Sequence, residues 1–121
     1  MPTTEASRLA LVTSHGGDFY GEDRHPARVL LSVAEYAYLL HHDERELVVQ
    51  LLREAAGSPA GTTRSIPTAQ VATLAPPLRR LARNRMKPAD ARTAALLADA
   101  AERAAADGDA WTWRAEDGDA A

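Results

Sequence analysis

The segment from Pro88 to Gly108 constrains the fold more than any other part of the sequence. It reads "PADARTAALLADAAERAAADG", and alanine, the residue with the highest helix propensity, predominates in it. Proline is favoured at the first position of a helix, and glycine is favoured just after the last. These signals predict one helix over about residues 88–107. Because alanine side chains are small, another helix can approach closely, and we expect a central position for this one.

Two more helices are predicted from apolar residues that recur at helical spacing. The first covers about residues 26–41 and begins at Pro26. The second begins at Asp43, whose carboxylate can accept hydrogen bonds from the free N–H groups of a first helical turn, and it stops before Gly57. Each helix has its apolar residues in one stripe, so each is expected to pack one side against the core.

Two prolines interrupt the helical pattern of residues 67–85. Pro76 and Pro77 lie near its middle. A proline inside a helix removes a backbone hydrogen bond and clashes with the preceding turn, at a cost of about 3 kcal/mol. We therefore expect two short helices, over about 67–75 and 77–85, with a bend at the prolines.

Two segments near the chain ends predict strands. Residues 8–14 are a short apolar run closed by a turn, and residues 110–116 alternate tryptophan with polar residues. A two-stranded ribbon is unstable alone and needs helices over one face. The side chains expected to make that contact are Leu9, Leu11, Trp111 and Trp113. The predicted fold is a small α+β domain, predominantly α, with four to five helices packed on a two-stranded antiparallel ribbon formed by the N- and C-terminal strands.

Length and composition predict a single cytoplasmic domain. The 121 residues suffice for one hydrophobic core. We expect a globular body over residues 7–115, a flexible loop over 57–65 and a frayed acidic tail over 116–121. The sequence has no cysteine and no apolar run long enough to span a membrane, and its net charge is −3. These features favour the cytoplasm and disfavour a membrane location.

Residues 13–26, "TSHGGDFYGEDRHP", concentrate the side chains that are capable of chemistry. Their imidazole and carboxylate groups could ligate a metal ion, and N–H groups at the start of the following helix could bind an anion or a phosphate-bearing ligand. Because the spacing matches no established motif, we predict no metal or cofactor, and a turn leading into a helix is the preferred interpretation. The candidate ligand-binding residues are Ser14, His15, Asp18, Asp23 and His25.

A basic helical face is the second candidate site. Arg79, Arg80 and Arg83 fall on the polar side of a predicted helix. Such a face can bind nucleic-acid phosphates or an acidic patch of another protein, although arginines paired with neighbouring carboxylates would explain it structurally. The acidic total and the lack of interleaved aromatic residues disfavour nucleic acid. Trp111 and Trp113 complete the set of candidate partner-binding residues, because tryptophan often anchors binding surfaces.

Both ends of the chain resemble a group of short proteins from Streptomyces-type actinobacteria. The resemblance rests on "TSHGGDFYGED" near the start, "WTWRAE" near the end and the alanine-rich helix that precedes the latter. The proteins of that group combine a Ser-His-Gly segment with a closing Trp-x-Trp. No activity is assigned to the group, so the resemblance implies a bacterial cytoplasmic setting and transfers no functional residues.

These observations favour a small non-catalytic module that binds another protein, or a second copy of itself as a homodimer, in a binding or regulatory role. Two alternatives stay open. One is a small enzyme or ligand-binding protein that depends on a metal or an anionic ligand and uses residues 14–25. The other is a nucleic-acid-associated regulator that uses the basic helix of residues 79–87. No catalytic motif is present, so an enzyme is not the preferred prediction.

Overall fold

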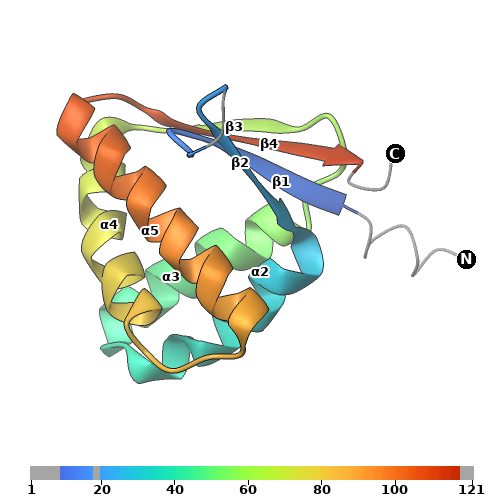
Figure 1. Cartoon of the computed structure of the whole chain (residues 1–121). Helices are drawn as coiled ribbons and strands as arrows, with labels where there is room; N and C mark the ends of the chain where they lie inside the picture. Colours follow the sequence, from blue (N-terminus) through green and yellow to red (C-terminus); the bar gives the residue numbers. More distant parts are fainter. Residues whose placement is uncertain (1–8, 18–19, 118–121) are drawn as a thin grey trace, which may run out of the picture.

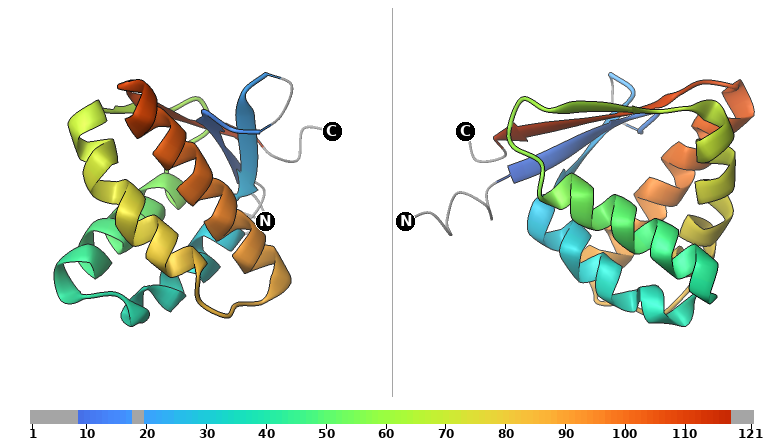
Figure 2. Two further views of the ribbon diagram at one scale, coloured as in Figure 1. Left: turned by 60° about the vertical axis from the view of Figure 1, so that its left-hand side comes forward. Right: turned by 180° about the vertical axis from the view of Figure 1, so that it is seen from behind.

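The computed structural model describes residues 9–17 and 20–117, which form an antiparallel sheet and a layer of helices over one of its faces (Figure 1). The view from behind in Figure 2 shows the same two layers. Among the described residues, no helix combines the length and the apolar character that crossing a membrane requires. In chain order the elements are β1 (Leu9–Ser14), β2 (Glu22–Pro26), α2 (Ala27–Ala34), the 3-10 helix η1 (Glu35–Leu39), α3 (His42–Ala56), β3 (Thr63–Ile66), α4 (Thr68–Ala82), α5 (Pro88–Asp107) and β4 (Trp111–Asp117).

The sheet has four antiparallel strands in the order β2-β1-β4-β3. The two end strands pair at its centre, where Leu11 lies opposite Ala115 and Thr13 lies opposite Trp113. The predicted fold, a two-stranded ribbon under four to five helices, is nevertheless wrong. β2 and β3 extend the sheet on both sides, and the helical layer consists of α2, α3, α4 and α5 with the short η1.

The two outer strands have little hydrophobic strand signal of their own. β2 reads "EDRHP", which we interpreted as the approach to a helix, and β3 reads "TRSI" and begins within the expected flexible loop of residues 57–65. Both pair with hydrophobic inner strands, and such tertiary pairing overrides weak local propensity. β4 also takes in Glu116 and Asp117 from the expected frayed tail. The remaining tail residues and the first two residues of the expected body lie outside the described residues.

α5 confirms the helix predicted from local signals. It runs from Pro88 to Asp107 and ends at Gly108, which has a φ of 70°. This left-handed conformation is the one in which glycine commonly follows a helix. A capping proline, alanine-rich turns and a terminating glycine therefore agree over the whole element.

The helices before α5 differ in their bounds from the prediction. α2 ends at Ala34, earlier than the helix expected over 26–41, and continues as the tighter η1. α3 begins at His42 and not after a cap at Asp43, although it ends before Gly57 as predicted. The start of α3 has no side-chain cap hydrogen bond, so packing contributes to fixing it.

α4 continues through the two prolines that were expected to break it. It spans Thr68–Ala82 without interruption, with Pro76 and Pro77 inside. The prediction of two helices over 67–75 and 77–85 is therefore wrong. Pro77 is buried together with the apolar stripe of α4, and α4 packs along α5. This packing outweighs the local cost of the prolines.

The hydrophobic core lies between the sheet and the helices. α5 contributes fully buried alanines such as Ala98 and Ala101, beside which α4 and α2 pack. β4 contributes Trp111 and Trp113, whose rings meet edge to face with centroids 4.8 Å apart. The period of two residues in β4 thus directs both tryptophans into the core.

Candidate metal centre

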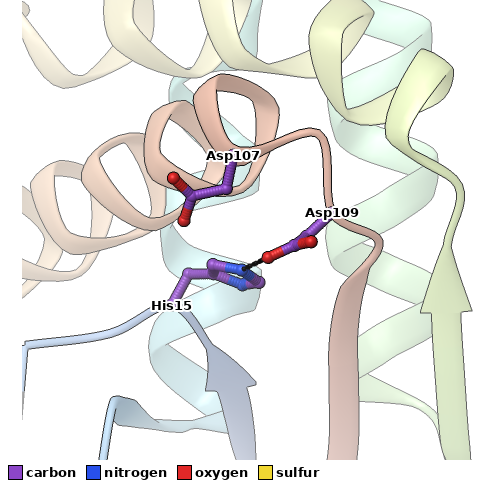
Figure 3. Close-up of side chains that lie close together, drawn as sticks. All are labelled: His15, Asp107 and Asp109. Carbon is purple, nitrogen blue, oxygen red and sulfur yellow. Dashed lines mark hydrogen bonds and ion pairs between the residues drawn. The ribbon is translucent and has the colours of Figure 1, made fainter.

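The ends of β1 and α5 bring together His15, Asp107 and Asp109 (Figure 3). One imidazole nitrogen or carboxylate oxygen from each residue lies within 4.8 Å of the corresponding atoms of the other two. His15 directly follows β1, Asp107 is the last residue of α5, and Asp109 lies in the connection to β4. We call these three residues the cation cluster.

The turn at the end of α5 places the two carboxylates on the same side. The backbone N–H of Asp109 donates to the carbonyl of Ala104 at 3.0 Å, and that of Gly108 donates to the carbonyl of Ala105 at 3.2 Å. This is the hydrogen-bond pattern of a Schellman turn, with glycine in the left-handed position. The turn sends the chain back along β1 as β4, so Asp109 meets His15, the residue that directly follows β1.

Both ring nitrogens of His15 have a partner. Nε2 lies 3.1 Å from Oδ2 of Asp109, and Nδ1 lies 2.9 Å from Oγ of Ser14. Ser14 Oγ in turn accepts a hydrogen bond from the backbone N–H of Thr112 at 3.0 Å. With the ring proton on Nδ1, His15 donates to Ser14, and its Nε2 lone pair is then available to a metal ion.

The backbone of this segment is held from two sides. The indole Nε1 of Trp111 donates to the carbonyl of Ser14 at 3.0 Å, and the guanidinium of Arg103 donates to the carbonyl of His15 at 2.8 Å. His15 has a φ of 61°, which lies in the left-handed region that side chains with a Cβ rarely occupy. Contacts from β4 and α5 therefore maintain a conformation that the local sequence disfavours.

The charges of the cation cluster favour a positive ligand. Within the described part of the chain, the carboxylate of Asp107 has no hydrogen bond or ion pair. Asp107 and Asp109 both lie at the C-terminal end of α5, where the helix dipole disfavours negative charge. A cation between the two carboxylates and the imidazole would offset this repulsion. One nitrogen and two oxygen donors form a set that zinc accepts.

The structure places the predicted ligand-binding residues that it describes in two different parts of the molecule. His15 is a member of the cation cluster, and Ser14 lies within hydrogen-bond distance of the His15 ring. Asp23 and His25 are instead buried on β2, and Asp18 lies outside the described residues. The four described residues do not share one site because alternate residues of a strand face opposite sides of a sheet.

Two members of the cation cluster were missed in the sequence. Asp109 follows His15 by 94 positions, and Asp107 lies two residues before Asp109. The local signal was the Asp-Gly-Asp sequence at the predicted end of a helix, which places carboxylates at an unfavourable helix terminus. Only the pairing of β1 with β4 shows that a histidine lies beside them.

Burial of His25 makes stability depend on pH. Burial lowers the pKa of His25 from 6.5 to about 4, against the opposing attraction of Asp23. Between these two values the unfolded chain binds a proton that the folded protein excludes, so the free energy of unfolding falls as pH decreases through this window. We expect a loss of up to about 3 kcal/mol by pH 4.

Urea denaturation of the wild type and of His25→Phe at pH 7 and pH 4.5 measures this effect. Carboxylates titrate in both proteins, so the difference between the two pH dependences isolates His25. The variant should lose less stability on acidification, and His42→Ala, which removes an exposed imidazole, should retain the wild-type dependence. Parallel curves for wild type and His25→Phe would contradict the assignment.

Two of the three predicted partner-binding arginines pair with carboxylates of neighbouring helices. Arg79 lies 2.5 Å from Asp99 and 2.7 Å from Glu102, both on α5. The hydrogen bonds that Arg79 donates to Glu102 and Asp99 raise the pKa of Arg79 above its ordinary value. Arg80 forms an ion pair with Glu44 of α3. The two arginines thus connect α4 to its neighbours.

The remaining predicted partner contacts differ in exposure. Trp111 and Trp113 are 0% and 2% exposed, so they lie in the core and present no surface to a partner. Arg83 is exposed and lines an open groove of about 430 Å³ together with Ala72 and Ala75. A role in binding a protein or nucleic acid stays a prediction for the basic helix.

Comparison with known families places the chain in one of them. The family described as "Domain of unknown function (DUF7739)" matches residues 16–114. The chain belongs to this family. The matched segment includes Asp107 and Asp109 and begins one residue after His15. Searches of curated proteins and of solved structures found no match.

Proposed function

We propose that this member of the DUF7739 family binds a divalent metal ion of the zinc class through the cation cluster. The observation that carries the proposal is the convergence of an imidazole and two carboxylates within 4.8 Å. Zinc takes nitrogen and oxygen donors, and sites with three protein ligands leave a fourth position for water or a ligand. Calcium and magnesium prefer sets made only of oxygen, so the histidine favours zinc.

Ser14 supports this proposal as the orienting group. A metal-bound histidine usually donates its other ring N–H to a nearby acceptor, which fixes the ring. Ser14 Oγ lies 2.9 Å from Nδ1 of His15 and is itself held by the N–H of Thr112. Ser14 thus keeps Nε2 directed toward the carboxylates.

Isothermal titration of the purified protein with ZnCl₂ tests the proposal. We expect one ion per chain, a loss of affinity of at least about 100-fold in His15→Ala, and a loss of about 10- to 100-fold in Ser14→Ala. Asp107→Asn should also weaken binding. The matched controls are His42→Ala and Asp43→Asn, which remove an exposed imidazole and an exposed carboxylate elsewhere.

The control variants decide how the titration is interpreted. Equal affinity in wild type and His15→Ala, or equal losses in His15→Ala and His42→Ala, would contradict binding at the cation cluster. Bound zinc should also raise the midpoint of thermal unfolding, by mass action, in the wild type and not in His15→Ala.

A second candidate function, protein binding, is supported by apolar side chains exposed on α2, η1 and α3. Helical spacing places Arg28 and Glu35 in the same stripe as Leu31, so charges of both signs border the apolar residues. A surface with mixed charges can pair with its own copy about a two-fold axis, and we therefore propose a second copy of this chain as the occupant. The exposed apolar residues are Leu31, Tyr38, Leu39 and Leu47.

Sedimentation velocity over a range of protein concentrations tests this self-association. The wild type should dimerise with increasing concentration, and Leu31→Glu combined with Tyr38→Glu should remain monomeric. Tyr20→Glu, which changes an exposed tyrosine shortly before β2, should associate as the wild type does. A wild type that stays monomeric at all concentrations would contradict the dimer and leave the zinc proposal unaffected.

The cellular setting that we propose is the cytoplasm of an actinobacterium. The resemblance of both chain ends to Streptomyces-type proteins supports the source. The absence of cysteine agrees with a protein that does not depend on disulfides for its stability.

A further inference from the structure

A row of polar side chains crosses the buried face of the sheet. Asp23 on β2 lies opposite Thr13 on β1, and Thr13 lies opposite Trp113 on β4. His25 follows two residues after Asp23 on the same strand, so its side chain is directed to the same face. We call these four residues the interior polar row.

The interior polar row contains polar atoms that have no protein partner. Thr13 and His25 are fully buried, and Trp113 and Asp23 are 2% and 9% exposed. Buried polar atoms nearly always have a hydrogen-bond partner in a folded protein, whether protein or ordered water. The atoms of the row without one are Thr13 Oγ1, Asp23 Oδ2, His25 Nδ1, His25 Nε2 and Trp113 Nε1.

The mixture of donors and acceptors specifies the kind of molecule that fits. The indole N–H of Trp113 can only donate, and the carboxylate of Asp23 can only accept. Thr13 can do both, and the neutral imidazole of His25 has one donor and one acceptor nitrogen. An anion would be repelled by Asp23, and a simple cation would offer no acceptor to Trp113. A neutral molecule that both donates and accepts matches the hydrogen-bonding groups of all four residues.

The packing beside Trp113, at one end of the row, leaves some space. A small, partly open pocket of about 10 Å³ includes one member of the row, Trp113, in its lining. The other lining residues are Leu11, Ala55, Ser58, Thr62, Arg64 and Ala115. This volume approaches the size that one water molecule requires. Side chains therefore do not completely fill the space beside Trp113 on this face of the sheet.

We infer that the interior polar row is an internal binding site for a neutral molecule that both donates and accepts hydrogen bonds, water being the smallest. The site is distinct from the cation cluster and does not depend on zinc. Asp23 links it to the surface turn, because Oδ1 of Asp23 accepts a hydrogen bond from the N–H of Gly17 at 3.1 Å while Oδ2 is directed elsewhere. An occupant would thus stabilise the pairing of β1 and β2 near the turn.

Rotating-frame NOE spectra of the isotope-labelled, zinc-free wild type test this inference. The Trp113 Nε1 proton and a His25 ring proton should show exchange-independent cross-peaks to a long-lived bound water. If the occupant is a co-purified small molecule, native mass spectrometry should show its mass and the NOEs should arise at its own resonances. Either source supports the site.

The isosteric variant Thr13→Val tests whether the row acts as a unit. It should fold, as judged by its amide spectrum, and should weaken the cross-peaks of Trp113 and His25 at least about twofold. Thr63→Val, on the exposed part of β3, should leave them unchanged. A wild type without these cross-peaks and with the mass of the bare chain would overturn the inference, as would Thr13→Val spectra identical to those of the wild type.

Discussion

Gly16→Ala is expected to destabilise the protein by about 3 kcal/mol or more. A Cβ at this position would lie 2.5 Å from the backbone nitrogen of Asp23 and 2.6 Å from its Cγ, and closer still to the carbonyl carbon of Glu22. Two of these three atoms belong to the backbone of β2, so relief requires β1 and β2 to separate. Such movement would break the contact between the N–H of Gly17 and Asp23, and it would displace His15.

Gly17→Ala is the matched control for this variant. An added Cβ at Gly17 meets nothing within 4 Å, and the N–H that binds Asp23 is retained. We expect a change within about 0.5 kcal/mol, as for most surface substitutions. Urea denaturation of both variants measures the difference. Equal stabilities would show that the close approach at Gly16 does not hold the hairpin, and zinc affinity should fall in Gly16→Ala alone.

Trp111→Ala is expected to have the largest effect of any core truncation, about 3 to 5 kcal/mol. The side chain is completely buried and packs edge to face on Trp113. Alanine would leave a cavity between the sheet and the helices. The substitution would also remove the indole donor to the carbonyl of Ser14, which lies directly before His15.

Trp111→Phe separates packing from hydrogen bonding. It retains most of the apolar volume but lacks the donor to Ser14, so we expect a loss of about 1 to 2 kcal/mol together with weaker zinc binding. Tyr38→Ala, at an aromatic residue that is 67% exposed, should change stability by less than about 0.5 kcal/mol. Similar losses in Trp111→Ala and Tyr38→Ala would refute the central role of Trp111.

The cation cluster and the interior polar row both depend on the pairing of β1 with its neighbours. His15 reaches Asp109 only because β4 pairs with one edge of β1. Thr13 lies opposite Asp23 only because β2 pairs with the other edge of β1. Gly16 lies between the two sites at the start of the turn. Substitution of Gly16 is therefore expected to affect both sites, because it disturbs the close contact between Gly16 and the backbone of β2.

The sequence by itself determined the elements whose signals are local. α5 is bounded by Pro88 and Gly108, and both residues act through backbone preferences that need no tertiary partner. The alternation around Trp111 and Trp113 likewise predicted a strand with one buried face, and both tryptophans lie in the core. Ser14 and His15 were identified as candidates because polar groups capable of chemistry cluster around them.

The tertiary structure decided everything that depends on neighbours distant in the sequence. The polar β2 and β3 become strands because hydrophobic inner strands supply their hydrogen bonds, and α4 continues through Pro76 and Pro77 because it is packed on α5. Asp109 joins His15 across 94 positions for the same reason. Local sequence sets backbone preferences of a few kcal/mol at most, whereas burial and strand pairing, summed over many residues, exceed them and select the partners.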